Sequence, residues 1–183
     1  MVLQIYLYGS NVLREKTESV TPDYPDLKQL IDNMYETMNN AEGVGLAAPQ
    51  VGKAIRLFVV DASPMAEDYP DAKDFKKTFI NPTIIETYGE PFAYKEGCLS
   101  VPNIREEIVR DSMVKIKYFD EDFNEHTDVY DGIISRIVQH EYDHIEQIMF
   151  TDRMSQLKKK LLKRKLDGIK GGKNTPAYKA RIN

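Results

Sequence analysis

The hydrophobic residues of segment 26–41 (DLKQLIDNMYETMNNA) recur at the spacing of an α-helix. Apolar side chains three and four positions apart lie on one side of a helix. The apolar face consists of Leu27, Leu30, Ile31, Met34 and Met38. The pattern stops at Glu42-Gly43, so it predicts an amphipathic helix that ends there.

The middle of the chain carries patterns typical of β-strands. Segments 55–61 (IRLFVVD) and 78–85 (TFINPTII) are rich in β-branched and aromatic residues, and a polar segment, 62–77, separates them. Segments 104–110 and 113–119 alternate apolar and polar residues, which predicts neighbouring strands with one face in water. Strands followed by a late helix favour an α+β fold, with antiparallel or mixed sheets around that helix, over a doubly wound sheet.

A second helical pattern begins near Asp131 and includes two histidines. Its stripe consists of Ile133, Ile137, His140, His144 and Ile148. Two imidazoles four residues apart on a helix point the same way, and Glu141 directly follows the first. Buried imidazoles need a partner, which is either a hydrogen bond in the core or a divalent metal. The HExxH pattern, which adds a carboxylate able to carry protons, favours the metal.

A catalytic metal needs at least one further protein ligand and an open position. Cys98, in the segment EGCLS at 96–100, is the candidate, although a lone cysteine is often just a small buried side chain. Segment 43–50 (GVGLAAPQ) contains small residues that let a substrate approach the backbone. A tight connection between a helix and a strand explains its glycines equally well, but not Gln50 beside so much apolar surface. The segment lacks the Lys-Ser/Thr ending of a phosphate loop.

The length and composition suit one compact domain over residues 1–183. Of the 183 residues, 42% are hydrophobic, and no long Pro/Gly/Ser linker divides the chain. No apolar run approaches the roughly 20 residues of a membrane span, and the first residues lack the order of a signal peptide. A single cysteine rules out an internal disulfide. We therefore expect a cytoplasmic protein.

Charge is divided unevenly along the chain. Residues 151–183 contain eleven Lys or Arg and two Asp, a charge of about +9. Because the whole chain carries −4, residues 1–150 carry about −13. The basic part, 152–183, is expected to form a helix followed by a loose end from residue 168. This helix either lies on the acidic body with its lysines in solvent or docks on a polyanion such as RNA.

The basic helix has a predicted start and two predicted apolar rows. Thr151 or Asp152 is expected to cap it. One row consists of Met154, Leu157 and Leu161, and the neighbouring row of Leu162, Leu166 and Ile169. Narrow apolar rows of this kind are typical of a helix that packs along one side only.

Three motifs together resemble the peptide deformylase family: GVGLAAPQ at 43–50, EGCLS at 96–100 and QHEYDH at 139–144. The resemblance covers at least residues 43–150, and 62–77 looks like a modest insertion. Within the family, the chain resembles the form that has a helical C-terminus. One departure is Gln147, where the family often has a glycine, and it concerns the end of the metal-binding helix.

The resemblance implies an enzyme that removes the formyl group from the N-terminal formylmethionine of newly made proteins. It implies one divalent metal ion, held by Cys98, His140 and His144. Fe(II) is characteristic of the family, and Zn(II), Ni(II) or Co(II) are alternatives. Glu141 would carry the proton, while the Gln50 side chain and the Leu99 backbone N–H would stabilise the oxyanion.

The resemblance also implies how a peptide is bound. The backbone at Val44 and Gly45 would hold the peptide extended, as an added strand is held. Val44, Ile133 and Ile137 would form the wall of an apolar pocket for methionine. The alternative for the two isoleucines is ordinary core packing.

Further residues are expected to support the metal ligands. Glu96 and Arg110 would pair and steady the cysteine loop. Asp143 would orient a ligand from outside the coordination sphere. Such partners fix the orientation of a coordinating imidazole.

Two other functions stay open on the residues alone. A zinc metallopeptidase also carries HExxH, but it usually takes its third ligand from a carboxylate or histidine beyond the helix. A non-catalytic metal-binding protein would close the coordination with a fourth protein ligand, and His126 lies in a polar turn that suits this poorly. As partners we expect N-formylmethionyl nascent peptides, the ribosome surface through the basic helix, and no membrane.

Overall fold

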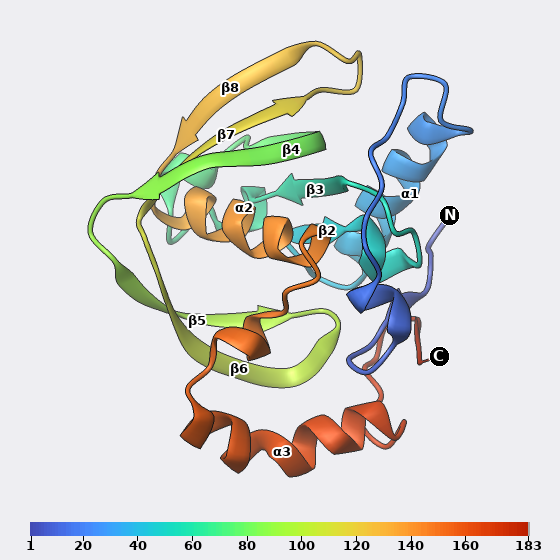
Figure 1. Ribbon diagram of the computed structural model, residues 1–183, viewed down its shortest axis with the longest axis vertical. Coiled ribbons are helices and arrows are strands. Elements are labelled where there is room, and N and C mark those ends of the chain that lie inside the picture. The colour runs from blue at the N-terminus through green and yellow to red at the C-terminus, as the bar shows by residue number, and fades with distance from the viewer. Residues whose placement is uncertain (183) are drawn as a thin grey trace.

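The computed structural model describes residues 1–182, which form an α+β fold (Figure 1). Its largest sheet has five antiparallel strands in the order β2-β3-β4-β7-β8. These strands are β2 (Gly45–Ala47), β3 (Leu57–Asp61), β4 (Lys76–Tyr88), β7 (Met113–Phe119) and β8 (Glu125–Tyr130). Two smaller sheets pair β5 (Phe92–Cys98) with β6 (Val101–Arg110) and β1 (Ile5–Tyr6) with β9 (Ala180–Arg181). The predicted fold class is confirmed.

The α-helices of residues 1–182 are α1 (Leu27–Asn40), α2 (Gly132–Ile145) and α3 (Gln156–Lys170). Helix α2 runs between the five-stranded sheet and the β5–β6 hairpin, and α3 lies on the outer side of that hairpin (Figure 1). Short 3₁₀ helices cover Asn11–Arg14, Ala48–Val51, Ser63–Met65, Pro70–Ala72 and Phe150–Arg153. Of the helices in this part of the chain, none has the length and apolar character needed to cross a membrane.

The five-stranded sheet is covered on both faces because successive side chains of a strand point to opposite sides. Leu57 and Val59 of β3 share a core with Met34 of α1. Phe58 and Val60, the alternate residues, share the other core with the apolar side of α2. The predicted helix over 26–41 is therefore α1, and α2 is held between the sheet and the hairpin.

The predicted helix start near Asp131 is confirmed, but its end is not. The Asp131 carboxylate accepts a hydrogen bond from the Gly132 N–H at 2.6 Å and caps α2. The helix ends at Ile145, so Ile148 lies beyond it and not on the predicted stripe. Gln147 has a φ of 59°, in the left-handed region that favours glycine. The chain therefore turns away at the residue that departs from the family pattern.

The strand pairing differs from the prediction. Segments 104–110 and 113–119 are strands but not neighbours, because β6 pairs with β5 while β7 pairs with β4 and β8. Strands β5 and β8 were not predicted. Their alternating positions include lysine, glutamate, histidine and aspartate, which give a weak apolar pattern.

Helix α3 begins later than predicted. The Ser155 hydroxyl accepts a hydrogen bond from the Lys158 N–H at 3.3 Å and caps the helix. Thr151 and Asp152 lie in the preceding 3₁₀ helix instead. The predicted caps were therefore wrong by about one turn, since serine, threonine and aspartate all suit this position.

The two predicted rows of α3 have different environments. Leu166 and Ile169 are buried against the hairpin, together with the half-buried Leu162. Met154 is buried but precedes the helix. Leu157 and Leu161 are 68% and 73% exposed, so that row faces away from the body.

Residues 173–182, called the C-terminal strap below, are folded against the body, contrary to the expectation of a loose end. The N–H groups of Ile5 and Leu7 donate to the carbonyls of Lys179 and Arg181 at 3.0 and 2.9 Å. Strand β9 therefore lies parallel to β1, and the first and last strands are side by side (Figure 1). The part of that expectation that falls on Asn183 lies outside the described residues.

Candidate functional site

The three predicted metal ligands meet at one point. Cys98 is the last residue of β5, and His140 and His144 lie one turn apart on α2. One ligand atom from each residue lies within 4.8 Å of the others. Cys98 Sγ is 3.3 Å from His144 Nε2. A strand end and a helix that are far apart in the sequence thus supply one donor set.

This donor set fits a divalent transition metal. Bonds of about 2.3 Å to sulfur and 2.0–2.1 Å to imidazole nitrogen place two tetrahedral ligands roughly 3.6 Å apart, near the observed separation of Cys98 and His144. Burial lowers the pKa of His144 well below its usual value. That imidazole is therefore kept in its neutral, metal-binding form. Among the described residues the group has three members, which leaves a fourth position open.

Glu96 lies beside His140 and fixes its orientation. One oxygen of Glu96 is 2.9 Å from His140 Nδ1, which leaves Nε2 for a metal. The carboxylate also accepts hydrogen bonds from Arg110 at 2.7 and 3.1 Å and from Arg136 at 2.9 Å. Burial alone would raise the pKa of Glu96, but the hydrogen bonds from His140 and Arg110 outweigh it and hold that pKa well below its usual value. The expected pair of Glu96 and Arg110 is present.

Asp143 takes a different place from the predicted one. Its hydrogen bonds go to arginines instead of a histidine. It accepts from Arg110 at 2.7 Å and from Arg153 at 2.6 and 2.5 Å. Because Arg110 also binds Glu96, Asp143 supports His140 through two intermediate side chains.

Glu141 lies against Gly45, the second glycine of the GVG segment. A methyl group added to Gly45 would collide with the Glu141 carboxylate, so only glycine leaves room. A methyl group added to Gly43 would lie 2.8 Å from Leu99 Cδ1. Burial raises the pKa of Glu141 to about 7, and its Oε2 has no hydrogen-bond partner among residues 1–182. A buried carboxylate with a free oxygen is thus held next to the donor set.

Two nitrogen donors flank Cys98. Gln50 Nε2 lies 3.5 Å from Cys98 Sγ and 3.1 Å from Ser100 Oγ, while its Oε1 accepts from the Ala47 N–H at 2.8 Å. The Ala47 contact fixes which way the amide points. The Leu99 N–H has no acceptor in the described part of the chain, whereas the Ser100 N–H donates to Cys98 Sγ at 3.4 Å.

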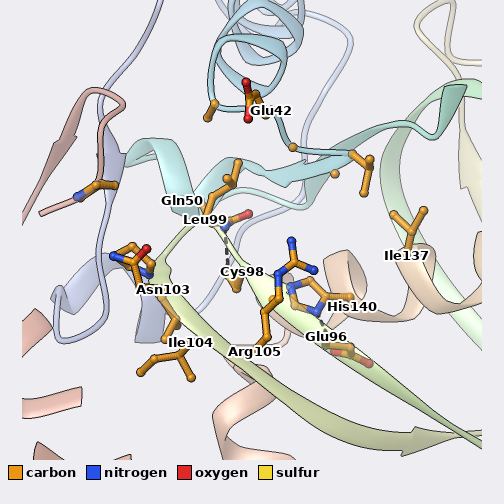
Figure 2. Close-up of a pocket in the computed structure, with 18 of the residues that line it drawn as sticks. Glu42, Gln50, Glu96, Cys98, Leu99, Asn103, Ile104, Arg105, Ile137 and His140 are labelled. Atoms are coloured by element: carbon orange, nitrogen blue, oxygen red, sulfur yellow. Dashed lines mark hydrogen bonds and ion pairs between the residues drawn. The ribbon is translucent and has the colours of Figure 1, made fainter. Parts of the chain in front are cut away.

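A cavity of about 950 Å³ opens beside the donor set, and Figure 2 shows Gln50, Cys98 and His140 together at its base. The three residues predicted for the methionine pocket, Val44, Ile133 and Ile137, line this cavity. Gly45 and Glu141 line it as well. Both isoleucines also belong to the core around α2. The two isoleucines therefore take part both in core packing and in the wall of the cavity.

Sequence reasoning missed part of the lining. The missed residues include Glu42, Tyr94, Arg105 and the segment 175–178. Tyr94 is two positions before Glu96 on β5 and so lies on the same face of the strand, which is a signal that the sequence contains. The segment 175–178 carries no comparable signal, because its place depends on the pairing of β9 with β1.

A cysteine sulfur, two imidazoles and a buried carboxylate beside an open cavity define a metal-dependent hydrolase. The third ligand comes from a strand before the helix, unlike the zinc peptidase pattern. The remaining histidine, His126, pairs with Asp120 at 2.7 Å and does not belong to the donor set. The described residues therefore supply no fourth ligand of the kind a purely structural site needs.

Comparison with known proteins agrees with this class. The family model of polypeptide deformylase matches residues 2–160. A peptide deformylase from Flavobacterium johnsoniae is 52% identical, with 100% of this chain and 96% of the relative covered. One from Salinibacter ruber is 44% identical, with 97% and 93% covered.

Solved structures give the same result for the fold. The peptide deformylase of Legionella pneumophila superposes with a TM-score of 0.81 at 34% identity and covers 96% of this chain and 100% of its own. That of Thermus thermophilus has a TM-score of 0.83 at 33% identity, with 94% and 100% covered. The chain belongs to the polypeptide deformylase family. It is a metal-dependent hydrolase that removes the formyl group from the N-terminal formylmethionine of newly synthesised proteins.

Proposed function

We propose that Cys98, His140 and His144 hold the metal and that Glu141 is the proton carrier of the deformylation. The observation that carries this proposal is the buried Glu141 carboxylate, which lines the cavity with one oxygen unpartnered. A pKa near 7 suits a group that must take up and release a proton at neutral pH. Glu141 takes a proton from the attacking water and then gives it to the leaving amine. The products are formate and a peptide with a free N-terminus.

Gln50 and Leu99 are proposed to stabilise the oxyanion that forms on the formyl oxygen. The Gln50 amide is already oriented by the Ala47 N–H, so its NH₂ group needs no rearrangement. The Leu99 N–H is free to donate. Preorganised donors of this kind typically contribute roughly 10²–10³ in rate each. When bound, the divalent ion supplies Lewis acidity, which makes a water more acidic and polarises the formyl group.

The methionine side chain is proposed to lie against Val44, Ile133 and Ile137. Val44 lines the cavity from the residue before β2, and the two isoleucines line it from α2, so they offer an apolar wall beside the donor set. The backbone at Val44 and Gly45 would align the peptide along the edge of β2, which is the outermost strand of its sheet.

For the physiological metal we propose Fe(II), with Zn(II), Ni(II) and Co(II) as ions that the site also accepts. One thiolate and two imidazoles suit all four ions. Intrinsic affinity favours zinc over iron at such a site, so cellular supply decides the occupant. The metal content of protein purified without oxygen, measured by plasma mass spectrometry, tests this choice. A preparation that holds zinc alone would contradict it.

Glu141→Ala tests the proton carrier. Its metal content should stay near that of the parent, while the rate of formate release should fall by roughly 10²-fold or more, because general acid–base catalysis is lost. Glu146→Gln, at the end of the same helix, is the matched control and should keep activity within twofold. Activity of Glu141→Ala within a few-fold of the parent would remove this residue from the mechanism.

Cys98→Ser tests the third ligand. A serine hydroxyl is a weak ligand for these ions, so metal content and activity should fall together. The measurement is the metal content of dialysed protein beside its activity. Full metal content in this variant would place the third ligand elsewhere.

We further propose that residues 1–183 form one catalytic domain that works in the cytoplasm and docks on ribosomes through α3. The exposed face of that helix carries Leu161 and three basic residues, Lys160, Arg164 and Lys165. No ion pair is found for these three basic residues in the described part of the chain. The phosphates of ribosomal RNA attract such a basic face. They repel the acidic body, so the opposite side of the protein would point away from the ribosome.

Charge reversal tests docking better than truncation, because truncation would also remove the strap that lines the cavity. Lys160→Glu, Arg164→Glu and Lys165→Glu together should reduce co-sedimentation with ribosomes at low salt, with turnover of a short formyl peptide unchanged. Reversal of Lys28, Lys53 and Lys73, which are exposed on the body, is the control with the same change of charge. Equal sedimentation of both triple variants would mean that α3 is only a solvated surface.

A further inference from the structure

The loop that carries the Leu99 N–H is held by both ends of the chain. This loop, residues 98–100, connects β5 to β6. The Ser100 carbonyl accepts a hydrogen bond from the Tyr8 N–H at 2.7 Å. The Leu99 carbonyl accepts one from the Tyr178 hydroxyl at 2.5 Å. Two successive carbonyls are therefore fixed from outside the hairpin, one by the segment after β1 and one by the strap.

The strap is placed firmly enough to act as a support. Helix α3 ends in a turn in which Gly172, with a φ of 71°, donates to the Ile169 carbonyl, and the Lys173 N–H donates to Gly168 at 2.8 Å. This closed turn directs the chain back across the cysteine loop. The strap then pairs with β1, whose neighbour Tyr8 holds Ser100. The strap and the loop are thus fastened to the same strand.

The side-chain pattern of the strap agrees with its docking. Tyr178, Ala180 and Ile182 are half-buried, whereas Lys179 and Arg181 are exposed. This alternation is that of a strand with one face on the protein. Tyr178 packs at the edge of the core under α1, so its hydroxyl is brought to Leu99 by a ring that is itself packed.

The strap also borders the substrate cavity. Thr175, Pro176, Ala177 and Tyr178 belong to the same lining as Gln50. All of them lie beyond residue 160, where the match to the family model ends. The strap therefore lies beyond the region that the family model matches, and it borders the cavity that Gln50 also lines.

We propose that Tyr178 is a positioning residue of this enzyme. By holding the Leu99 carbonyl it fixes the backbone torsions of Leu99, and these torsions aim the N–H of the adjoining Cys98–Leu99 peptide at the oxyanion. The inference rests on the proposed role of the Leu99 N–H. Without the hydroxyl, the Leu99–Ser100 peptide keeps the contact of the Ser100 N–H with Cys98 Sγ and, one residue further on, the contact of the Tyr8 N–H with the Ser100 carbonyl, so the Leu99 torsions can vary more. A donor that is turned away for part of the time stabilises the oxyanion less, and the substrate in its ground state is bound equally well. The loss should therefore appear in kcat.

Tyr178→Phe is the test, because it keeps the packed ring and removes only the hydroxyl. We expect kcat for a formyl-Met-Ala-Ser peptide to fall about fivefold to thirtyfold, less than the roughly 10²-fold typical when a donor is lost outright. KM should stay within twofold, and the melting temperature within about 2 °C. Amide hydrogen exchange at Leu99 and Ser100, followed by NMR on the zinc-loaded enzyme, should become at least tenfold faster. Tyr88→Phe, at the far end of β4, is the matched control and should change none of these values.

The outcomes separate the two proposals. Unchanged exchange at Leu99 with unchanged kcat would overturn the role of Tyr178. Faster exchange with unchanged kcat would overturn the role of the Leu99 N–H, and the catalytic part of this inference with it. A parallel loss of kcat, metal content and melting temperature would show a general support of the fold, and would also overturn the positioning role.

Discussion

Two carboxylates in this molecule collect several hydrogen bonds each, and they differ in burial. The Glu96 side chain is 3% exposed and binds two arginines and His140. The Asp128 side chain is 33% exposed and accepts from Lys77 at 3.0 Å and from the hydroxyls of Tyr118 and Tyr130 at 2.7 Å each. Glu96 lies beside the donor set, whereas Asp128 lies on β8, the edge strand of the five-stranded sheet.

The comparison shows that the number of hydrogen-bond partners does not decide how much a carboxylate contributes to the free energy of unfolding. For both residues, burial raises the pKa and hydrogen bonds outweigh it, so that the pKa ends below its usual value. Water can replace the partners of Asp128, whereas the two arginines that bind Glu96 are buried away from water. Removing a partner from a buried ionic group leaves an uncompensated charge, which typically costs about 3–5 kcal/mol, whereas exposed pairs contribute about 0–1 kcal/mol.

Glu96→Gln should give the largest effect. It leaves Arg110 and Arg136 buried without their carboxylate, so the free energy of unfolding should fall by about 3–5 kcal/mol. The His140 ring loses the charged acceptor for its Nδ1, because the glutamine amide is neutral and has a single oxygen, and metal affinity should drop about 10–100-fold. Urea unfolding of the metal-free protein and a chelator competition measure the two effects separately. A variant with parental metal affinity would show that Glu96 serves the fold alone.

Arg110→Met should have a smaller effect, because Glu96 keeps Arg136 and His140 while Asp143 keeps Arg153. We expect a loss of about 2–3 kcal/mol in the free energy of unfolding. Arg153→Met is the control, since it contacts the same aspartate but is 40% exposed, and it should cost less than about 1 kcal/mol. Equal losses in the two variants would contradict the importance of burial.

Asp128→Asn should have the smallest effect, about 0.5–1 kcal/mol, with metal content and activity unchanged. Its pH dependence sharpens the comparison. The hydrogen bonds from Tyr118, Tyr130 and Lys77 overcome the effect of burial and lower the Asp128 pKa from 3.8 to about 2. The stability that this gives is present above pH 4 and is lost as the pH falls through about 2. Unfolding in urea at pH 5 and near pH 2 should therefore show a difference between parent and variant that vanishes in acid.

The sequence predicted local features well. The spacing of Leu27, Ile31 and Met34 predicted α1, and the HExxH motif placed both histidines on the buried helix α2. These patterns depend on residues three and four apart, so one segment contains all the information. Three motifs together also identified some of the residues that line the cavity, among them Gln50, Cys98 and His140.

The sequence failed where distant segments meet. Residues 111–112 look like a short hairpin turn between 104–110 and 113–119, but the two strands join different sheets. Strand β6 pairs with β5, whose apolar pattern is weak. Strand β7 pairs with β4, which lies far from it in the sequence. The strap was missed for the same reason, since its inward side chains, Tyr178, Ala180 and Ile182, are too few to give a period. Ser155 was missed because several nearby residues make equally good caps.

The parallel pairing of β1 with β9 also has a consequence for folding. It joins Ile5 to Ala180, so closing this contact restricts nearly the whole chain, and among the described strands β9 is the last to be synthesised. The donor set and the hairpin can form while the strap is still inside the exit tunnel, but the Leu99 loop then lacks one of its two restraints. If Tyr178 positions Leu99 as proposed, each enzyme molecule reaches full activity only after the strap has left the ribosome and paired with β1.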